Sequence, residues 1–168
     1  LPINRKQKVF PNGTLVIENV ERMSDQATYT CVAKNSQGYS VRGNLELQVM
    51  VPPQIMPFEF GEEPVNAQEM VLVTCTVTKG DLPLAIEWFF NDHLVKSGSN
   101  GVNLMNTKRT SQLSVESVTH QNQGNFTCVV KNQAGVINHT AELFVNVPPR
   151  WILEPTDKAF AQGSDAKV

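Results

Sequence analysis

The sequence predicts an all-β fold in which two antiparallel sheets pack face to face as a sandwich. Two features predict it: short strands in which apolar and polar residues alternate, and a Cys…Trp…Cys spacing across the middle of the chain. Cys75 lies in a β-branched run at residues 71–78, Trp88 follows 13 residues later, and Cys128 comes 53 residues after Cys75. The complete sandwich is therefore expected around these three residues.

Composition and charge narrow the class of protein. The chain has 168 residues, 40% apolar side chains and a net charge of −2, which is typical of a soluble globular protein and gives no basis for a nucleic-acid partner. No apolar run approaches the ~18 residues of a membrane span, and the N-terminus lacks the apolar centre of a signal peptide. We therefore expect an internal piece of a larger protein. The basic residues Arg5, Lys6 and Lys8 are interpreted as a solvated strand face, and the alternative is contact with an acidic glycan.

One element occurs twice in the chain. Residues 25–35 and 122–132 share a pattern centred on Cys31 and Cys128, and each is followed by a small-residue turn and then by Val-Pro-Pro, at 51–53 and 147–149. The two copies are 97 residues apart. A repeat of about a hundred residues that ends in paired prolines predicts tandem sandwich domains with short linkers. The expected organisation is the C-terminal half of a domain at 1–51, a complete domain at 52–147, and the N-terminal strand region of a further domain at 148–168. Trp151 would lie in that first strand.

Alternation places the strands in order. In the partial domain we expect strands at 15–17, 29–34 and 45–49. In the complete domain we expect them at 70–78, 84–90, 102–106, 111–116, 125–131 and 136–147, after a first segment at 54–66 that Pro57 and Pro64 interrupt. Residues 91–93 are expected to form a turn. The two-residue period directs Trp88, Leu113 and Phe126 into the core.

The cysteine and tryptophan spacing is similar to the signature of immunoglobulin domains, in an I-set-like form. The resemblance implies that Cys75 and Cys128 lie on strands B and F of opposite sheets and form a disulfide against Trp88. Closing a loop of about 50 residues would contribute roughly 3–5 kcal/mol. Cys31 lies on the earlier copy of strand F. We interpret it as a structural cysteine whose partner lies upstream of residue 1, and the alternative is a free functional thiol.

The two copies differ at the residue that makes a tyrosine corner, two positions before the strand F cysteine. Tyr29 occupies this position in the first copy, and Phe126 occupies it in the second, where Asn122 also replaces Asp25. The corner hydrogen bond is therefore expected only in the first copy. Its loss should cost about 1 kcal/mol in the second, which other packing must offset.

Three Asn-x-Ser/Thr sequons, the acceptor motif for N-linked glycans, are present at Asn12, Asn125 and Asn138. Together with a disulfide framework they favour a secreted or cell-surface setting. Alternation places Asn125 and Asn138 on the outward face of the sheet formed by strands C, F and G. We hypothesise that glycan covers this face.

The sequence gives no support for catalysis. Its three histidines fall on a turn, a loop and a strand without a second metal ligand at the required spacing, and no nucleophile elbow or phosphate-binding loop is present. We therefore predict no enzyme activity, no metal and no cofactor. The histidines are interpreted as surface residues: His93, His120 and His139.

The sheet formed by strands A, B, E and D carries the candidate interaction surface. Its outward positions are mostly uncharged, and strand B begins with two apolar residues where water would be expected. One interpretation is that these are scattered exposed apolar residues, which are common on protein surfaces and indicate no function. The other is an adhesive surface, for which the candidates are Met70, Leu72, Thr74, Met105, Gln112 and Ser114.

The whole chain resembles the arthropod Down syndrome cell adhesion molecule (Dscam) family. Residues 1–15 and 147–165 are similar to the constant flanks of that family, at the end of its sixth and the start of its eighth immunoglobulin domain. Residues 52–147 resemble its variable seventh domain. The resemblance implies the extracellular portion of a single-pass membrane receptor. It also implies isoform-specific, homophilic, antiparallel pairing that serves neuronal self-avoidance and axon guidance.

Two alternatives stay open at this point. The same variable domain could bind microbial surface ligands in innate immunity. A purely structural tandem, as in muscle immunoglobulin proteins or the spacer of an enzyme-linked receptor, is a further alternative. Three sequons and the cysteine pattern argue against its cytosolic form.

Overall fold

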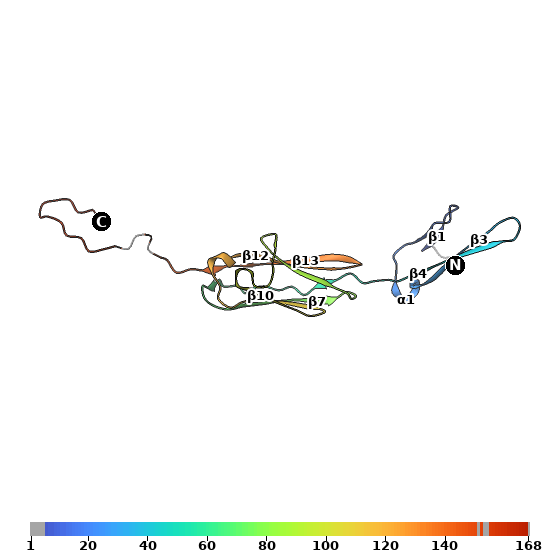
Figure 1. The fold of residues 1–168 in the computed structure, drawn as a ribbon, viewed down its shortest axis with the longest axis horizontal. Coiled ribbons are helices and arrows are strands. Elements are labelled where there is room, and N and C mark those ends of the chain that lie inside the picture. The colour runs from blue at the N-terminus through green and yellow to red at the C-terminus, as the bar shows by residue number, and fades with distance from the viewer. Residues whose placement is uncertain (1–5, 151, 153–154, 168) are drawn as a thin grey trace.

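The computed structural model describes residues 6–150, 152 and 155–167 of an elongated chain with a β-sandwich at its middle (Figure 1). A smaller β unit precedes the sandwich, and described residues 155–167 contain turns and irregular backbone but no strand. Trp151 lies outside the described residues. The further domain expected at 148–168 therefore stays a prediction.

The N-terminal unit consists of two hairpins and one helical turn. Strand β1 (Gln7–Val9) pairs with β2 (Leu15–Ile17), and β3 (Ala27–Lys34) pairs with β4 (Ser40–Leu47). Helix α1 (Arg22–Asp25) lies between the hairpins. The strand predicted at 45–49 instead begins at Ser40. The side chain of Asn35 accepts hydrogen bonds from the backbone N–H groups of Gln37 and Tyr39, both at 3.0 Å, and so turns the chain back early.

The first sheet of the sandwich has the strand order β10, β11, β7, β5. All three of its pairings are antiparallel, and they join β5 (Gln54–Ile55), β7 (Val71–Lys79), β10 (Val102–Asn106) and β11 (Thr110–Val115). Strand β7 is buried at alternate residues from Val71 to Val77. This is the alternation that the sequence predicts for a strand with one face in the core and one face outside.

The second sheet has the order β13, β12, β8, β9. It is built from β8 (Ala85–Phe90), β9 (His93–Leu94), β12 (Gly124–Asn132) and β13 (Gly135–Leu143). The turn predicted at 91–93 is shorter than expected, because Asn91 and Asp92 both adopt positive φ, at 45° and 67°. Asn and Asp tolerate this left-handed region, so the chain reverses in two residues and His93 already belongs to a strand.

The core lies between the two sheets around the disulfide between Cys75 and Cys128, whose Cα atoms are 6.4 Å apart. Trp88, Leu113 and Phe126 are each at most 1% exposed. The indole Nε1–H of Trp88 donates to Oγ of Ser111 at 2.8 Å, and Ser111 is itself fully buried. The core therefore contains a polar partner for the tryptophan as well as the cross-link.

The last strand of the sandwich is broken, although the sequence predicts one strand over 136–147. Strand β13 ends at Leu143, and β14 (Val145–Asn146) continues as the parallel partner of β6 (Val65–Asn66). The break at Phe144 has a clear cause: its carbonyl accepts from Val65 N–H at 2.9 Å, and the next N–H, of Val145, donates to Oε1 of Gln123 at 3.0 Å.

The two copies of the corner differ as expected. The hydroxyl of Tyr29 donates to the carbonyl of Asp25 at 2.8 Å, which confirms the tyrosine corner in the N-terminal unit. In the sandwich, Phe126 instead packs against Phe60 and Phe90, with ring centroids 5.4 and 4.7 Å away. Asn122 helps to hold this corner, because its Oδ1 accepts from Thr119 N–H at 2.9 Å and its Nδ2 donates to a backbone carbonyl.

Two interpretations of surface residues are wrong. Lys6 is not simply solvated, because its Nζ lies 2.5 Å from Oδ2 of Asp25, a carboxylate that is only 2% exposed. His139 lies on the inward side of β13, where its Nε2 is 2.9 Å from the carbonyl oxygen of Phe58 and its ring stands edge-on to the phenyl group. Both side chains therefore tie separate segments together.

Candidate functional site

The outward residues of β7, β10 and β11 form two adjacent rows across the first sheet, which we call the candidate face. One row contains Leu72, Ser114 and Asn103 as successive cross-strand partners. The neighbouring row is Thr74, Gln112 and Met105. Five of the six residues predicted from alternation lie in these rows, and the sixth, Met70, immediately precedes β7.

The candidate face is accessible and uncharged. The side chains of Met70, Leu72 and Met105 are 61%, 51% and 68% exposed, while Thr74, Gln112 and Ser114 are partly exposed. Six side chains with apolar, hydroxyl and amide groups can make van der Waals contacts and hydrogen bonds without the desolvation penalty of a buried charge. The arrangement suits contact with a protein surface.

The sequons occupy different positions. Asn125 and Asn138 are exposed on β12 and β13, in the second sheet. Asn12 lies in the β1–β2 turn, where its Oδ1 accepts from Thr14 N–H at 3.1 Å. None of the three belongs to the candidate face.

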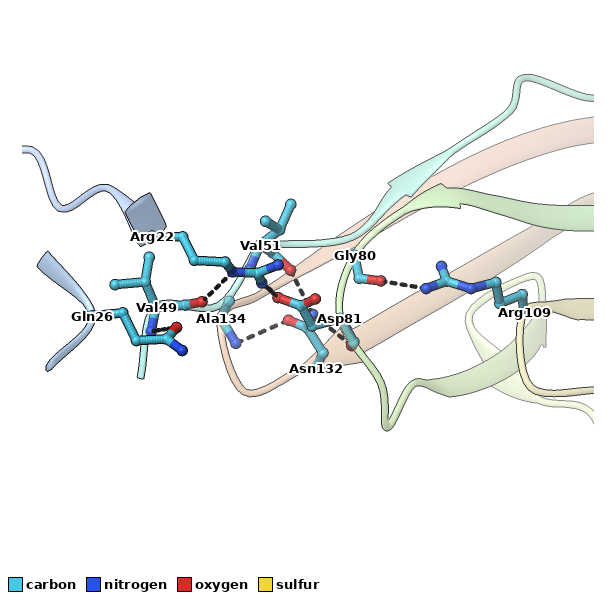
Figure 2. Close-up of polar contacts among 9 residues, drawn as sticks. All are labelled: Arg22, Gln26, Val49, Val51, Gly80, Asp81, Arg109, Asn132 and Ala134. Carbon is cyan, nitrogen blue, oxygen red and sulfur yellow. Dashed lines mark hydrogen bonds and ion pairs between the residues drawn. The ribbon is translucent and has the colours of Figure 1, made fainter. Parts of the chain in front are cut away.

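A second cluster of side chains joins the N-terminal unit to the sandwich through the linker at residues 48–53 (Figure 2). Oδ2 of Asp81 accepts from the linker N–H of Val51 at 2.7 Å and also forms an ion pair with the guanidinium of Arg22. Nε of Arg22 in turn donates to the carbonyl of Val49 at 3.1 Å. Arg22 therefore connects the helical turn of one unit, the linker and the loop between β7 and β8 of the sandwich.

Asn132 holds the linker from the other sheet. Its Nδ2 donates to the carbonyls of Val51 and Asp81 at 2.8 and 3.1 Å, and its Oδ1 accepts from the N–H groups of Ala134 and Gly135 at 2.9 and 3.1 Å. The residue is 6% exposed and has all four of its hydrogen-bonding positions in use. It fixes the linker and the β12–β13 turn together.

The linker also approaches the sandwich closely. Gly80 has φ of +125°, and a Cβ at this position would lie 2.8 Å from the Cα of Pro53. The guanidinium of Arg109 donates to the Gly80 carbonyl at 3.0 Å. Only glycine fits between the backbone of the linker and the end of β7.

The remaining predictions concern chemistry. Among the residues that the structure describes, no group of three or more His, Cys, Asp or Glu side chains could hold a metal ion, and no helix is long and apolar enough to cross a membrane. Cys31 lies on β3 with an exposed free thiol. That it pairs with a cysteine upstream of residue 1 stays a prediction.

The linker cluster and the role of Ser111 were not predicted from the sequence. One signal was available for the cluster, because the repeated Lys-Asn before each small-residue turn places Asn35 and Asn132 at equivalent positions. Both accept two backbone hydrogen bonds in the following turn. Arg22 and Asp81 are 59 residues apart, and no local pattern relates them.

Comparison with known proteins agrees with the fold. A family model described as "Immunoglobulin domain" matches residues 52–132. The solved structure of the Dscam1 Ig7 domain, isoform 5, is 40% identical to this chain with a TM-score of 0.56, and the match covers 56% of this chain and 97% of that one. The Drosophila melanogaster cell adhesion molecule Dscam1 is 62% identical over 169 residues, which covers all of this chain.

The chain belongs to the Dscam family. A Dscam structure containing the N-terminal eight Ig domains of isoform 1.30.30 aligns with 99% of this chain at 59% identity and a TM-score of 0.71, and the alignment covers 21% of that structure. The chain spans 8% of the length of fly Dscam1. Dscam proteins are immunoglobulin-domain cell adhesion molecules, a non-enzymatic family.

Proposed function

We propose that this chain is part of the ectodomain of a cell-surface adhesion receptor, and that its complete domain binds an identical copy through the candidate face. The carrying observation is the pair of uncharged, exposed rows on β7, β10 and β11. The names of the relatives, all cell adhesion molecules, support the adhesive part of the proposal. Attachment to the membrane would come from segments outside this sequence.

An antiparallel arrangement suits a flat sheet face. Two copies related by a two-fold axis present the same residues to each other, so each interface contact occurs twice. Isoform specificity would then follow, because one substitution in the rows changes two contacts and lowers the affinity for the unchanged form. Self-recognition of this kind is the property needed for the self-avoidance and axon guidance that the family resemblance implies.

The size of the face limits the expected affinity. Three strands at a spacing of about 4.8 Å and five residues, from Met70 to Thr74, at a rise of about 3.3 Å give roughly 14 by 17 Å, or ~240 Å² of projected area. A standard interface buries about 800 Å² per partner. We therefore expect weak association of this chain alone, and stronger association only where several such contacts act together.

Sedimentation of the full chain tests the proposal. A Cys31→Ser background prevents intermolecular disulfides, and Leu72→Asp and Gln112→Lys place charges in the two rows. Ala85→Asp and Val136→Lys put the same charges on exposed positions of the opposite sheet. Self-association that the first pair weakens and the second pair leaves unchanged is the expected result, and equal effects of the two pairs would contradict the face.

No observation favours the binding of microbial surface ligands over self-pairing. Binding to bacterial cells, measured beside self-association, distinguishes the two functions. A chain that binds the cells directly and stays monomeric at all concentrations would support the alternative.

A further inference from the structure

Both sequons of the sandwich lie on one face of one sheet. Asn125 is opposite Glu142 and Asn138 is opposite Val129 in the antiparallel register of β12 and β13. Residues that alternate with the two asparagines, Phe126 and His139, point inward. Asn125 and Asn138 therefore point outward, away from the core, and both are exposed.

The local chemistry of the two sites is complete. The hydroxyls of the sequon threonines, Thr127 and Thr140, are direct cross-strand neighbours with their oxygens 2.7 Å apart. Across the described part of the chain, neither side-chain amide, that of Asn125 or that of Asn138, forms a hydrogen bond to another residue. Each Nδ2 is therefore available, and a substituent on it would extend into solvent without breaking a contact of the fold.

The distribution of the sequons is asymmetric. The sequence contains three, two of them in the complete domain, and none falls on the strands of the first sheet. Asn103 and Asn106, on β10, lack the Ser or Thr two residues later. An N-linked glycan is bulky and strongly hydrated, so it prevents close approach of another protein surface over several residues.

We propose that Asn125 and Asn138 carry N-linked glycans, and that these shield the β8–β12–β13 face so that only the opposite sheet can pair. The second half of this statement rests on the proposed function. In the transfer, Nδ2 attacks the anomeric carbon of a lipid-diphosphate-linked oligosaccharide. The bond from that carbon to the diphosphate oxygen breaks, the lipid diphosphate leaves, and Nδ2 loses one proton.

Occupancy is measured on the full chain secreted from insect cells, by intact mass before and after peptide-N-glycosidase treatment and by mapping of Asn-to-Asp conversion. We expect conversion at both sites. Thr140→Val removes the acceptor motif at Asn138 with little change in side-chain shape, whereas Thr140→Ser keeps it. Glycan at Asn138 should be lost in the first variant and retained in the second, and absence of conversion at either asparagine in the parent overturns the proposal for that site.

The direction of the shield is tested by moving the glycan. Gln112→Asn and Leu72→Asn each create a sequon on the candidate face, with Ser114 and Thr74 as the hydroxyl residues. Each new glycan should abolish self-association, and enzymatic removal should restore it. The double variant Asn125→Gln with Asn138→Gln should keep pairing through the candidate face and should add association that Leu72→Asp does not weaken. Unchanged association would overturn the shield, and association weakened tenfold or more would place the glycosylated face inside the interface.

The two proposals fail separately. Unoccupied asparagines in a chain that still pairs through the candidate face would remove the glycan shield alone. The opposite outcome is that Asn125 and Asn138 are glycosylated, while a confirmed glycan in the Gln112→Asn variant does not weaken self-association. That result would support the modification and contradict the proposed pairing face.

Discussion

At the scale of single residues, the interior of the sandwich is specified by polar contacts as well as by apolar volume. Trp88 must bury its indole against the disulfide, and its N–H then needs an acceptor inside the core. Ser111 provides one from β11 and also contacts the side chain of Asn106. A buried donor without a partner costs more free energy than the hydrogen bond itself contributes. The buried indole N–H therefore requires an acceptor at position 111.

Removal of this acceptor should destabilise the sandwich. Ser111→Ala leaves the indole N–H unsatisfied, and we expect the free energy of unfolding to fall by about 1–3 kcal/mol. Ser114→Ala removes a hydroxyl from the same strand on its exposed side and should change the value by less than about 0.5 kcal/mol. Urea unfolding followed by circular dichroism measures both, and equal effects would mean that the indole bond is unimportant.

The ion pair between Lys6 and Asp25 gives the N-terminal unit a dependence on pH. A hydrogen bond from Lys6, together with one from the Glu21 backbone N–H, lowers the pKa of Asp25 below its ordinary value of 3.8. Because the ammonium group of Lys6 donates this hydrogen bond to the Asp25 carboxylate, the pKa of Lys6 is raised above its ordinary value of 10.5. The ion pair should therefore contribute its full stabilisation of the folded unit between pH 3.8 and pH 10.5. This stabilisation should be lost as the pH falls through the lowered pKa of Asp25 or rises through the raised pKa of Lys6.

Asp25→Asn should remove the acid limb of this dependence. The Tyr29 corner lies beside the pair, so its NMR signals should titrate below pH 3.8 in the parent and stay constant there in the variant. Glu18→Gln breaks the exposed pair with Lys8 and serves as the control, because it should leave the Tyr29 signals unchanged. If the Tyr29 NMR signals still changed below pH 3.8 in Asp25→Asn, the acid transition would belong to another carboxylate.

At the scale of elements, strands with one buried face could be predicted from the sequence and short or irregular ones could not. Strands β7, β8, β10, β11 and β12 fall within one or two residues of their predicted bounds, because one face of each is buried and the two-residue period shows it. Strand β9 has only two residues and no period to detect. Strand β14 depends on a parallel pairing with β6, about 80 residues earlier, which local pattern does not encode.

The functional residues also include some that the sequence predicts and some that it does not. Alternation alone placed Leu72, Thr74, Gln112 and Ser114 on one surface, because a strand has only two faces. The linker cluster was missed, since Arg22, Asp81 and Asn132 come from three distant segments that only the tertiary fold brings together. Contacts between units are set by tertiary geometry. The repeated Lys-Asn marks Asn132 as a residue that precedes a turn, but no local pattern indicates its contact with the linker.

The linker cluster should set the angle between the two units. Asp81→Ala removes the acceptor for Val51 N–H and the partner of Arg22, so we expect a broader distribution of maximum dimensions in small-angle X-ray scattering. The loss of stability should be only about 1–2 kcal/mol, because the ion pair is partly exposed. Glu87→Ala removes an exposed carboxylate on β8 that takes no part in the linker cluster, and it should leave the scattering curve unchanged. Identical curves for the parent and Asp81→Ala would mean that the prolines alone hold the angle.

At the scale of the whole molecule, the two sheets of the sandwich have different outward faces. One carries the uncharged rows and no sequon, and the other carries both sequons of the domain. The linker cluster attaches the preceding unit at one end of the sandwich, near Asp81 and Asn132, so neither sheet face is covered by it (Figure 1, Figure 2). The candidate face is therefore open along its full length for a second copy.

Two-fold symmetry gives the sharpest test of this arrangement. Gln112 lies on β11, the middle strand of the candidate face, so in an isologous dimer it is expected to face its own copy near the axis. Gln112→Glu and Gln112→Lys should each weaken self-association, while an equimolar mixture should form a heterodimer. Like charges about 4 Å apart repel by about 1 kcal/mol in water and about 4 kcal/mol at an effective dielectric constant of 20, and opposite charges attract equally. The same charge pair at Val136, on the other sheet, should show no preference for mixing. Equal sedimentation of the mixture and of the two separate variants at position 112 would exclude a two-fold axis near β11.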